Sequence, residues 1–156
     1  MKNNISLLLL FFTTNVYCQD ISYIKTLDTI FVSFKEDSFQ IKTVLPANSK
    51  GFQRWYVFYF EKNNKKENLY FWVSEYPGYR RREMNNKSDI RLVKNSFLKK
   101  HKNQIVGIDF FKNYDICALR DVFFNKVVYI IDTVERKKRK TTLYEVNPSF
   151  SCDPIE

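Results

Sequence analysis

Two side chains in the sequence could together act as a nucleophile and a general base. His101 is the only histidine, and Cys117 is one of three cysteines. A cysteine becomes nucleophilic when a neighbouring base removes its proton, so these two residues could form a Cys–His dyad. His101, however, lies in the basic run KKHK, with no acidic residue near it in sequence to orient its ring. The sequence therefore favours a histidine on the flank of a short helix over a catalytic one.

The acidic residues give no stronger catalytic signal. Glu36 and Asp37 lie in a predicted turn, and Asp132 ends a predicted strand. Hydrolysis by paired carboxylates requires that they converge in space, which these positions do not establish. One histidine with Cys117 and Cys152 does not make a closed zinc site of the usual spacing. The chain also contains no phosphate-binding glycine loop, nucleophile elbow or HExxH sequence. We therefore predict no catalytic residue, no metal site and no cofactor.

Three basic clusters are the strongest candidates for a binding surface. They are residues 80–82, 99–102 and 136–140. If they converged on one face, they would attract an anionic polymer or an acidic protein; the alternative is three separate, solvated turns. Tyrosines beside the first cluster could stack on sugars or bases. The candidate binding residues are Tyr76, Tyr79, Arg80, Arg81, Arg82, Lys99 and Lys100.

The opening residues, MKNNISLLLLFFTTNVYC, have the pattern of a secretory signal peptide. Lys2 gives a positive start, residues 5–12 form an apolar block, and polar residues follow. The block is too short for a transmembrane helix, which needs about 20 apolar residues. A buried core helix is the less favoured alternative. We expect residues 1–18 to be a signal peptide and the protein to be exported to the periplasm or secreted.

The position of the cleavage site decides whether Cys18 remains in the mature protein. Val16 and Cys18 have the small size that suits cleavage before Gln19. A lipoprotein cut before Cys18 would leave that residue lipid-anchored, but the preceding Tyr17 is bulky where that route prefers a small residue. We therefore expect Cys18 to leave with the signal peptide. Cys117 and Cys152 would then remain, either as a disulfide that ties the C-terminal residues to the domain or as free thiols.

The net charge of +9 raises the question of nucleic-acid binding. Export would separate the protein from cellular nucleic acid, so nucleic acid is the less favoured partner. The charge then belongs either to a solvated surface or to a surface that meets an anionic envelope polymer or an acidic protein.

The predicted strands come first along the chain and the helices later. Residues 54–61 and 69–74 are apolar on both faces and predict a central β-hairpin. Further strands are predicted within 21–35 and at 39–45, 89–94, 126–132 and 141–146, with helices at 97–105 and 109–125. This order predicts an α+β fold, a mostly antiparallel sheet with two short helices packed on one face and a C-terminal hairpin. We expect one domain over 19–146, a tail over 147–156, and a core centred on Val57, Phe58, Phe60, Phe71, Phe110, Tyr114, Val128 and Ile130.

The segment SFLKKHKNQIVGIDFF, followed by KVVYIID and TTLYEV, resembles an uncharacterised group of small exported proteins from Bacteroidota-type bacteria. In that group a FLKKxK…I helix precedes a YIID…LYEV hairpin, and the signal peptide typically ends before a glutamine. The resemblance covers residues 96–146 and implies export and a single domain. It implies no activity and no site residue.

These observations together predict a non-enzymatic binding protein of the cell envelope whose partner is a macromolecule. One alternative is an immunity-type inhibitor, whose basic surface would plug the acidic site of a toxin. The other is a small hydrolase that uses His101 or dispersed acidic residues. A pocket with a carboxylate within hydrogen-bond reach of His101 would favour the hydrolase.

Overall fold

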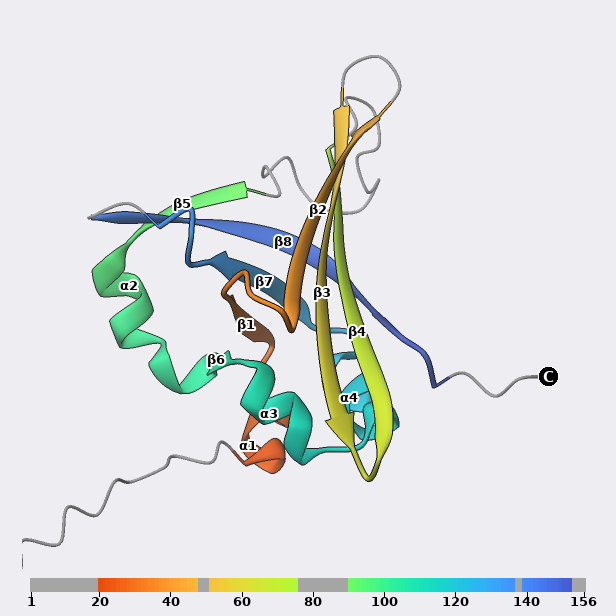
Figure 1. The fold of residues 1–156 in the computed structure, drawn as a ribbon. Helices are drawn as coiled ribbons and strands as arrows, with labels where there is room; N and C mark the ends of the chain where they lie inside the picture. The colour runs from red at the N-terminus through yellow and green to blue at the C-terminus, as the bar shows by residue number, and fades with distance from the viewer. Residues whose placement is uncertain (1–19, 48–50, 76–89, 137–138, 153–156) are drawn as a thin grey trace, which may run out of the picture.

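The computed structural model describes residues 20–47, 51–75, 90–136 and 139–152, which form one twisted sheet with short helices around it (Figure 1). The sheet has eight strands in the order β2-β3-β4-β8-β7-β1-β6, and β5 pairs with β8. Strand β1 is parallel to β6 and β7, and all other pairs are antiparallel. The predicted α+β class with a mostly antiparallel sheet is confirmed.

The elements are α1 (Ile21–Lys25), β1 (Thr29–Phe34), β2 (Gln40–Ala47), β3 (Gly51–Lys62), β4 (Lys65–Glu75), β5 (Ile90–Lys94), α2 (Asn95–Lys100), the 3-10 helix η1 (Lys102–Gln104), β6 (Ile105–Val106), α3 (Ile108–Asn113), α4 (Ile116–Phe123), β7 (Val127–Asp132) and β8 (Lys140–Phe150).

Strand β8 joins the two halves of the sheet. Its first part, up to Val146, pairs with β7 and β5, and its last four residues, 147–150, pair with β4. The C-terminal hairpin of β7 and β8 is confirmed, but β8 does not stop at Pro148 as the sequence suggested. Proline is tolerated at sheet edges, and among the described strands this part of β8 has β4 as its one partner. Residues 147–150, predicted as tail, therefore belong to the sheet.

The main core lies between the β3–β4 hairpin, the strands β1 and β7, and the helices α1, α3 and α4. Aromatic rings dominate it: Phe58 meets Phe111 edge-on at 5.2 Å and Phe34 at 5.7 Å between ring centroids. Six of the predicted core residues belong to this cluster. Tyr114 is half-buried against it, and Val57 is buried outside it.

A second, smaller core covers the opposite face of β1 and β7. It contains Phe31, Leu98, Tyr129, Ile131 and Leu143. Because these residues alternate along β1 and β7 with members of the main core, both strands bury side chains on both faces. Leu98 lies in α2, so α2 packs on this face while α3 and α4 pack on the other. The prediction that both helices share one face is wrong for this reason.

The predicted helix over 109–125 is two helices. Helix α3 ends at Asn113, and Tyr114 is extended, with φ −124° and ψ 152°. Asp115 then caps α4 by accepting a hydrogen bond from the backbone N–H of Cys117 at 2.9 Å. Aspartate is a preferred N-cap residue, so a new helix begins where the sequence had suggested continuation. None of the described helices has the length and apolar character that crossing a membrane requires.

Candidate functional site

The pairing of β5 with β8 brings two of the three predicted basic clusters together. Lys94 in β5 is the register partner of Lys140 in β8. The backbone N–H of Asn95 donates to the carbonyl of Arg139 at 3.1 Å, where β5 passes directly into α2 (Figure 1). We call the resulting surface the basic end; its residues, all exposed, are Arg91, Lys94, Lys99, Lys100, Lys102, Arg136, Arg139 and Lys140.

The basic end concentrates the positive charge of the described chain. Residues 90–104 contain no acidic residue, and neither do the described residues between Arg136 and Tyr144. The rest of the described chain carries ten lysines and arginines against thirteen aspartates and glutamates. Like charges opposite each other in a ladder destabilise it, so this arrangement costs stability. A surface with this concentration of positive charge attracts anions.

The other predicted binding residues belong to the first basic cluster and fall outside the described residues. They are Tyr76, Tyr79, Arg80, Arg81 and Arg82.

A hollow of about 560 Å³ opens beside the basic end. Its walls come from β5, from residues 26–29, which lead from α1 into β1, and from α2 and η1, which connect β5 to β6, the neighbour of β1. Phe31, Tyr129 and Leu143 of the smaller core form its base. Because Arg91 is both a lining residue and a member of the basic end, we call this space the Arg91 hollow.

His101 lies in the wall of the Arg91 hollow, against aromatic neighbours. Its ring is 4.2 Å from that of Phe97 and 5.9 Å from that of Phe31, measured between centroids. Its Nδ1 is 3.1 Å from Oε1 of Gln104. The imidazole thus forms its hydrogen bond with a neutral amide.

The described contacts do not make His101 catalytic. Its hydrogen-bond partner is an amide and not a carboxylate. Cys117 lies on α4 and packs against the main core, whereas His101 lies beside the smaller core on the other face of the sheet. The Cys–His dyad is therefore not formed.

Arg91 reaches over the base of the same hollow. Its guanidinium carbon lies 5.1 Å from the centre of the Tyr129 ring, a cation–π contact. The hydroxyl of Tyr129 donates to Oε2 of Glu145 at 3.1 Å, which fixes the ring beneath the guanidinium. The arrangement places one permanent positive charge over an aromatic base.

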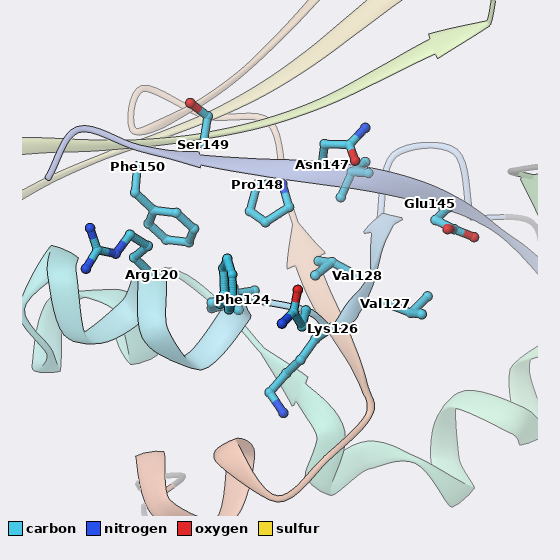
Figure 2. Close-up of a pocket in the computed structure, with 13 residues that line it drawn as sticks. Arg120, Phe124, Lys126, Val127, Val128, Glu145, Asn147, Pro148, Ser149 and Phe150 are labelled. Atoms are coloured by element: carbon cyan, nitrogen blue, oxygen red, sulfur yellow. The ribbon is translucent and has the colours of Figure 1, made fainter. Parts of the chain in front are cut away.

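A second hollow, of about 580 Å³, lies between the end of α4, the start of β7 and the last part of β8 (Figure 2). The rings of Phe123 and Phe150, which both line it, lie 5.9 Å apart between centroids, and Phe124 is 70% exposed. Its cations are engaged within the protein. Lys126 donates to the carbonyls of Lys25, at 2.8 Å, and of Leu27, and Arg120 pairs with Asp121 at 3.3 Å. This hollow thus mixes apolar and polar side chains, and both of its cations have partners within the protein.

A buried ionic cluster joins β2 and β3 to the end of β7. Nζ of Lys42 lies 2.8 Å from Oδ2 of the fully buried Asp132 and 3.3 Å from Oε1 of Glu135. Arg54 donates to the same Oε1 of Glu135 at 3.0 Å, and the Tyr144 hydroxyl donates to its Oε2. Two cations from β2 and β3, in one half of the sheet, thus balance two carboxylates at the end of β7, in the other half.

The pKa shifts in this cluster follow from these contacts. Burial alone would lower the pKa of Lys42, but the hydrogen bonds and charges of Asp132 and Glu135 outweigh burial and raise it. Burial alone would raise the pKa of Glu135, but the hydrogen bond from Tyr144 and the charges of Arg54 and Lys42 lower it. Each charge is stabilised by its partners, so the cluster is built to hold the sheet and not to exchange protons.

Sequence reasoning missed the ionic cluster because its cations and its carboxylates are far apart in the chain, 90 positions from Lys42 to Asp132 and 81 from Arg54 to Glu135. Asp132 was the one member noted from the sequence, as a carboxylate at a strand end. No local pattern links positions 42, 54, 132 and 135; the topology alone brings them together.

The two described cysteines are free thiols. The Cys117 thiol donates to the carbonyl oxygen of Cys152 at 3.7 Å. Its contact with the Cys152 thiol, together with partial desolvation, raises the pKa of Cys117 to about 11. Of the two expected alternatives, the structure therefore has free thiols, with Cys152 lying against α4.

No protein-family model matches the chain, and neither a curated protein nor a solved structure does. Within residues 20–152, apart from the gaps in the described ranges, no group of three or more histidine, cysteine, aspartate or glutamate side chains is placed to hold a metal ion.

Proposed function

We propose that this protein is an exported, non-enzymatic binding protein that attaches to an anionic polymer of the cell envelope through its basic end. The observation that carries the proposal is the pairing of β5 with β8, which sets Lys94 beside Lys140 in a region without acidic residues. The signal-peptide pattern of residues 1–18 supports export.

A repeating anion suits the chemistry of this surface. Lysines are compact point charges on flexible stems, and Lys99 and Lys100 at the end of α2 are exposed. Such flexible lysines can pair with the spaced anions of a polymer without requiring one fixed geometry. The clustered positive charge also raises the local concentration of a polyanion and accelerates its association.

The two alternatives are less well supported. The hydrolase would need an acid or base beside His101, where the side chain in contact is Gln104. The immunity-type inhibitor would use the same basic end on an acidic protein. Capture of one envelope protein, in place of polymer, would favour that alternative.

The test is co-sedimentation of the exported protein with isolated cell envelopes at increasing NaCl concentration. We expect binding to weaken steeply with salt, because exposed charges are screened. Replacing Lys99 and Lys100 together by glutamine should weaken binding at low salt by about 2 kcal/mol, on the order of 30-fold, since one lysine near an anionic surface contributes about 1 kcal/mol.

The matched control is the double replacement of Lys65 and Lys66 by glutamine. Both residues are exposed at the start of β4, and the change in net charge is the same. Equal losses in the two double variants, or binding that does not respond to salt, would contradict the proposal.

A further inference from the structure

We infer that the Arg91 hollow is a subsite for one carboxylate-bearing sugar residue, so that the anionic polymer is an acidic glycan. This inference rests on the proposed function and adds the class of its ligand. A volume of about 560 Å³ is within the range of small-molecule sites and exceeds what a simple ion needs. Arg91 belongs to both the hollow and the basic end, so one glycan chain can occupy both.

The lining combines apolar surface with several hydrogen-bonding groups. Val93 and Phe97 are half-buried on one wall, above the rings of Phe31 and Tyr129. A sugar ring has apolar C–H faces that pack on such surfaces and hydroxyl groups around its edge. A phosphate or a simple carboxylate would leave the apolar wall unused.

The polar lining groups argue against a fatty acyl chain. Thr26, Asp28 and Thr29 line the wall that leads into β1, and Gln104 lines the hollow from η1, which leads into β6, the neighbour of β1. An acyl chain would cover these groups without giving them hydrogen-bond partners, which costs free energy. Sugar hydroxyls both donate and accept, so they match a lining of threonine hydroxyls, an amide and a carboxylate. The imidazole of His101 adds one more hydrogen-bonding group to the lining.

The charges of the lining position the carboxylate of the sugar. Arg91 lies in β5 and Asp28 precedes β1, and the strands β8 and β7 separate β5 from β1 in the sheet. The two charges therefore come from opposite walls. A guanidinium binds a carboxylate through two parallel N–H groups, so the acidic group of the sugar belongs at Arg91. Hydroxyl groups at the other end of the ring would donate to Asp28.

The test measures the affinity of the exported protein for three probes by isothermal titration calorimetry. The probes are tetragalacturonate, the neutral cellotetraose, and linear polyphosphate of similar charge. We expect tetragalacturonate to bind, cellotetraose to bind at least tenfold more weakly, and polyphosphate to bind through charge alone.

Two matched pairs of variants separate the hollow from the basic end. Arg91→Gln and Lys94→Gln remove the same charge from the same strand, but Lys94 does not line the hollow. We expect Arg91→Gln to weaken tetragalacturonate binding at least tenfold and Lys94→Gln about threefold, with equal effects on polyphosphate. Gln104→Ala should weaken tetragalacturonate alone, and Asn103→Ala should weaken neither probe. Circular dichroism and the melting temperature verify that each variant is folded.

Each contrary outcome has a separate meaning. If polyphosphate binds as tightly as tetragalacturonate and Arg91→Gln matches Lys94→Gln with both, the sugar subsite is wrong and the proposed function stands. If cellotetraose binds as tightly as tetragalacturonate, the role of Arg91 is wrong. If no probe binds and the envelopes do not retain the protein, the proposed function itself fails.

Discussion

At the scale of single residues, Asp132 depends most on its surroundings. Its side chain is fully buried, and Lys42 lies 2.8 Å from one of its oxygens. The other oxygen accepts the backbone N–H groups of Val134 at 3.0 Å and Glu135 at 3.4 Å. This carboxylate therefore fixes both the strand end and the lysine that reaches it from β2.

Replacing Asp132 by asparagine should strongly destabilise the protein. The change removes the closest partner of Lys42 and leaves that ammonium group with less compensation for its burial. Breaking a buried pair in this way costs about 3–5 kcal/mol. The measurement is the free energy of unfolding in urea at neutral pH.

The control for that variant is Asp121→Asn. Asp121 pairs with Arg120 at 3.3 Å, and its side chain is 60% exposed. Exposed pairs contribute at most about 1 kcal/mol. Equal losses in the two variants would contradict the importance assigned to the buried cluster.

At the scale of elements, the strands were the most predictable part of the fold. The hairpin of β3 and β4 and the strands β1, β5 and β7 lie where apolar and β-branched residues had indicated them. Apolar and β-branched patterns of this kind predict strands well, because successive side chains of a strand point to opposite faces of the sheet. The sequence was less informative at helix boundaries, where single capping residues decide.

The segment from 108 to 123 illustrates this limit. Apolar spacing suggested one helix, but Tyr114 leaves the helical conformation and Asp115 accepts the backbone N–H of Cys117 at the start of a new helix. Likewise Asp20 caps the short helix α1 in a segment that we had included with the first strand. A single capping residue can therefore determine where a helix begins, even where the apolar spacing favours another boundary.

Asp115→Ala should therefore destabilise α4. The expected loss is about 1 kcal/mol in the free energy of unfolding, the usual contribution of an N-cap side chain. The matched control is Asp109→Ala, because Asp109 is an exposed acid in the first turn of α3 and does not cap it. Chemical denaturation of both variants compares the two positions, and an equal loss at Asp109 would show that the cap at Asp115 is not decisive.

At the scale of the whole molecule, the ionic cluster makes stability depend on pH. Glu135 has a lowered pKa in the folded protein, so its contribution is present above its unfolded pKa of about 4.3 and is lost as pH falls through the lower folded value. Lys42 has a raised pKa, so its contribution is present below about pH 10.4 and is lost as pH rises through the folded value.

The free energy of unfolding should thus decrease both in acid below about pH 4.3 and in base above about pH 10.4. Glu135→Gln should flatten the acid side of this profile, because glutamine does not titrate there. Denaturation at a series of pH values measures the effect. An unchanged acid slope in that variant would exclude Glu135 as its cause.

The basic residues of the candidate binding surface were predictable from the sequence, but their arrangement on one surface was not. Lys99, Lys100 and the run at 136–140 were evident as basic clusters, but their convergence depends on β5 pairing with β8, segments that are distant in sequence. The Arg91 hollow was not predicted at all, because its walls come from α1–β1, β5 and η1. Local sequence patterns therefore predict helices and strands, whereas the position of a binding site depends on which distant strands pair.

The position of β8 also governs the order in which the protein can fold. Strand β8 follows its partners β4, β5 and β7 in the chain and pairs with all three. Neither half of the sheet is complete until that late segment has emerged from the ribosome, and pairings of such long sequence separation form slowly. Under the proposed export, the same sequence order would keep the nascent polypeptide unfolded while it passes through a translocation channel.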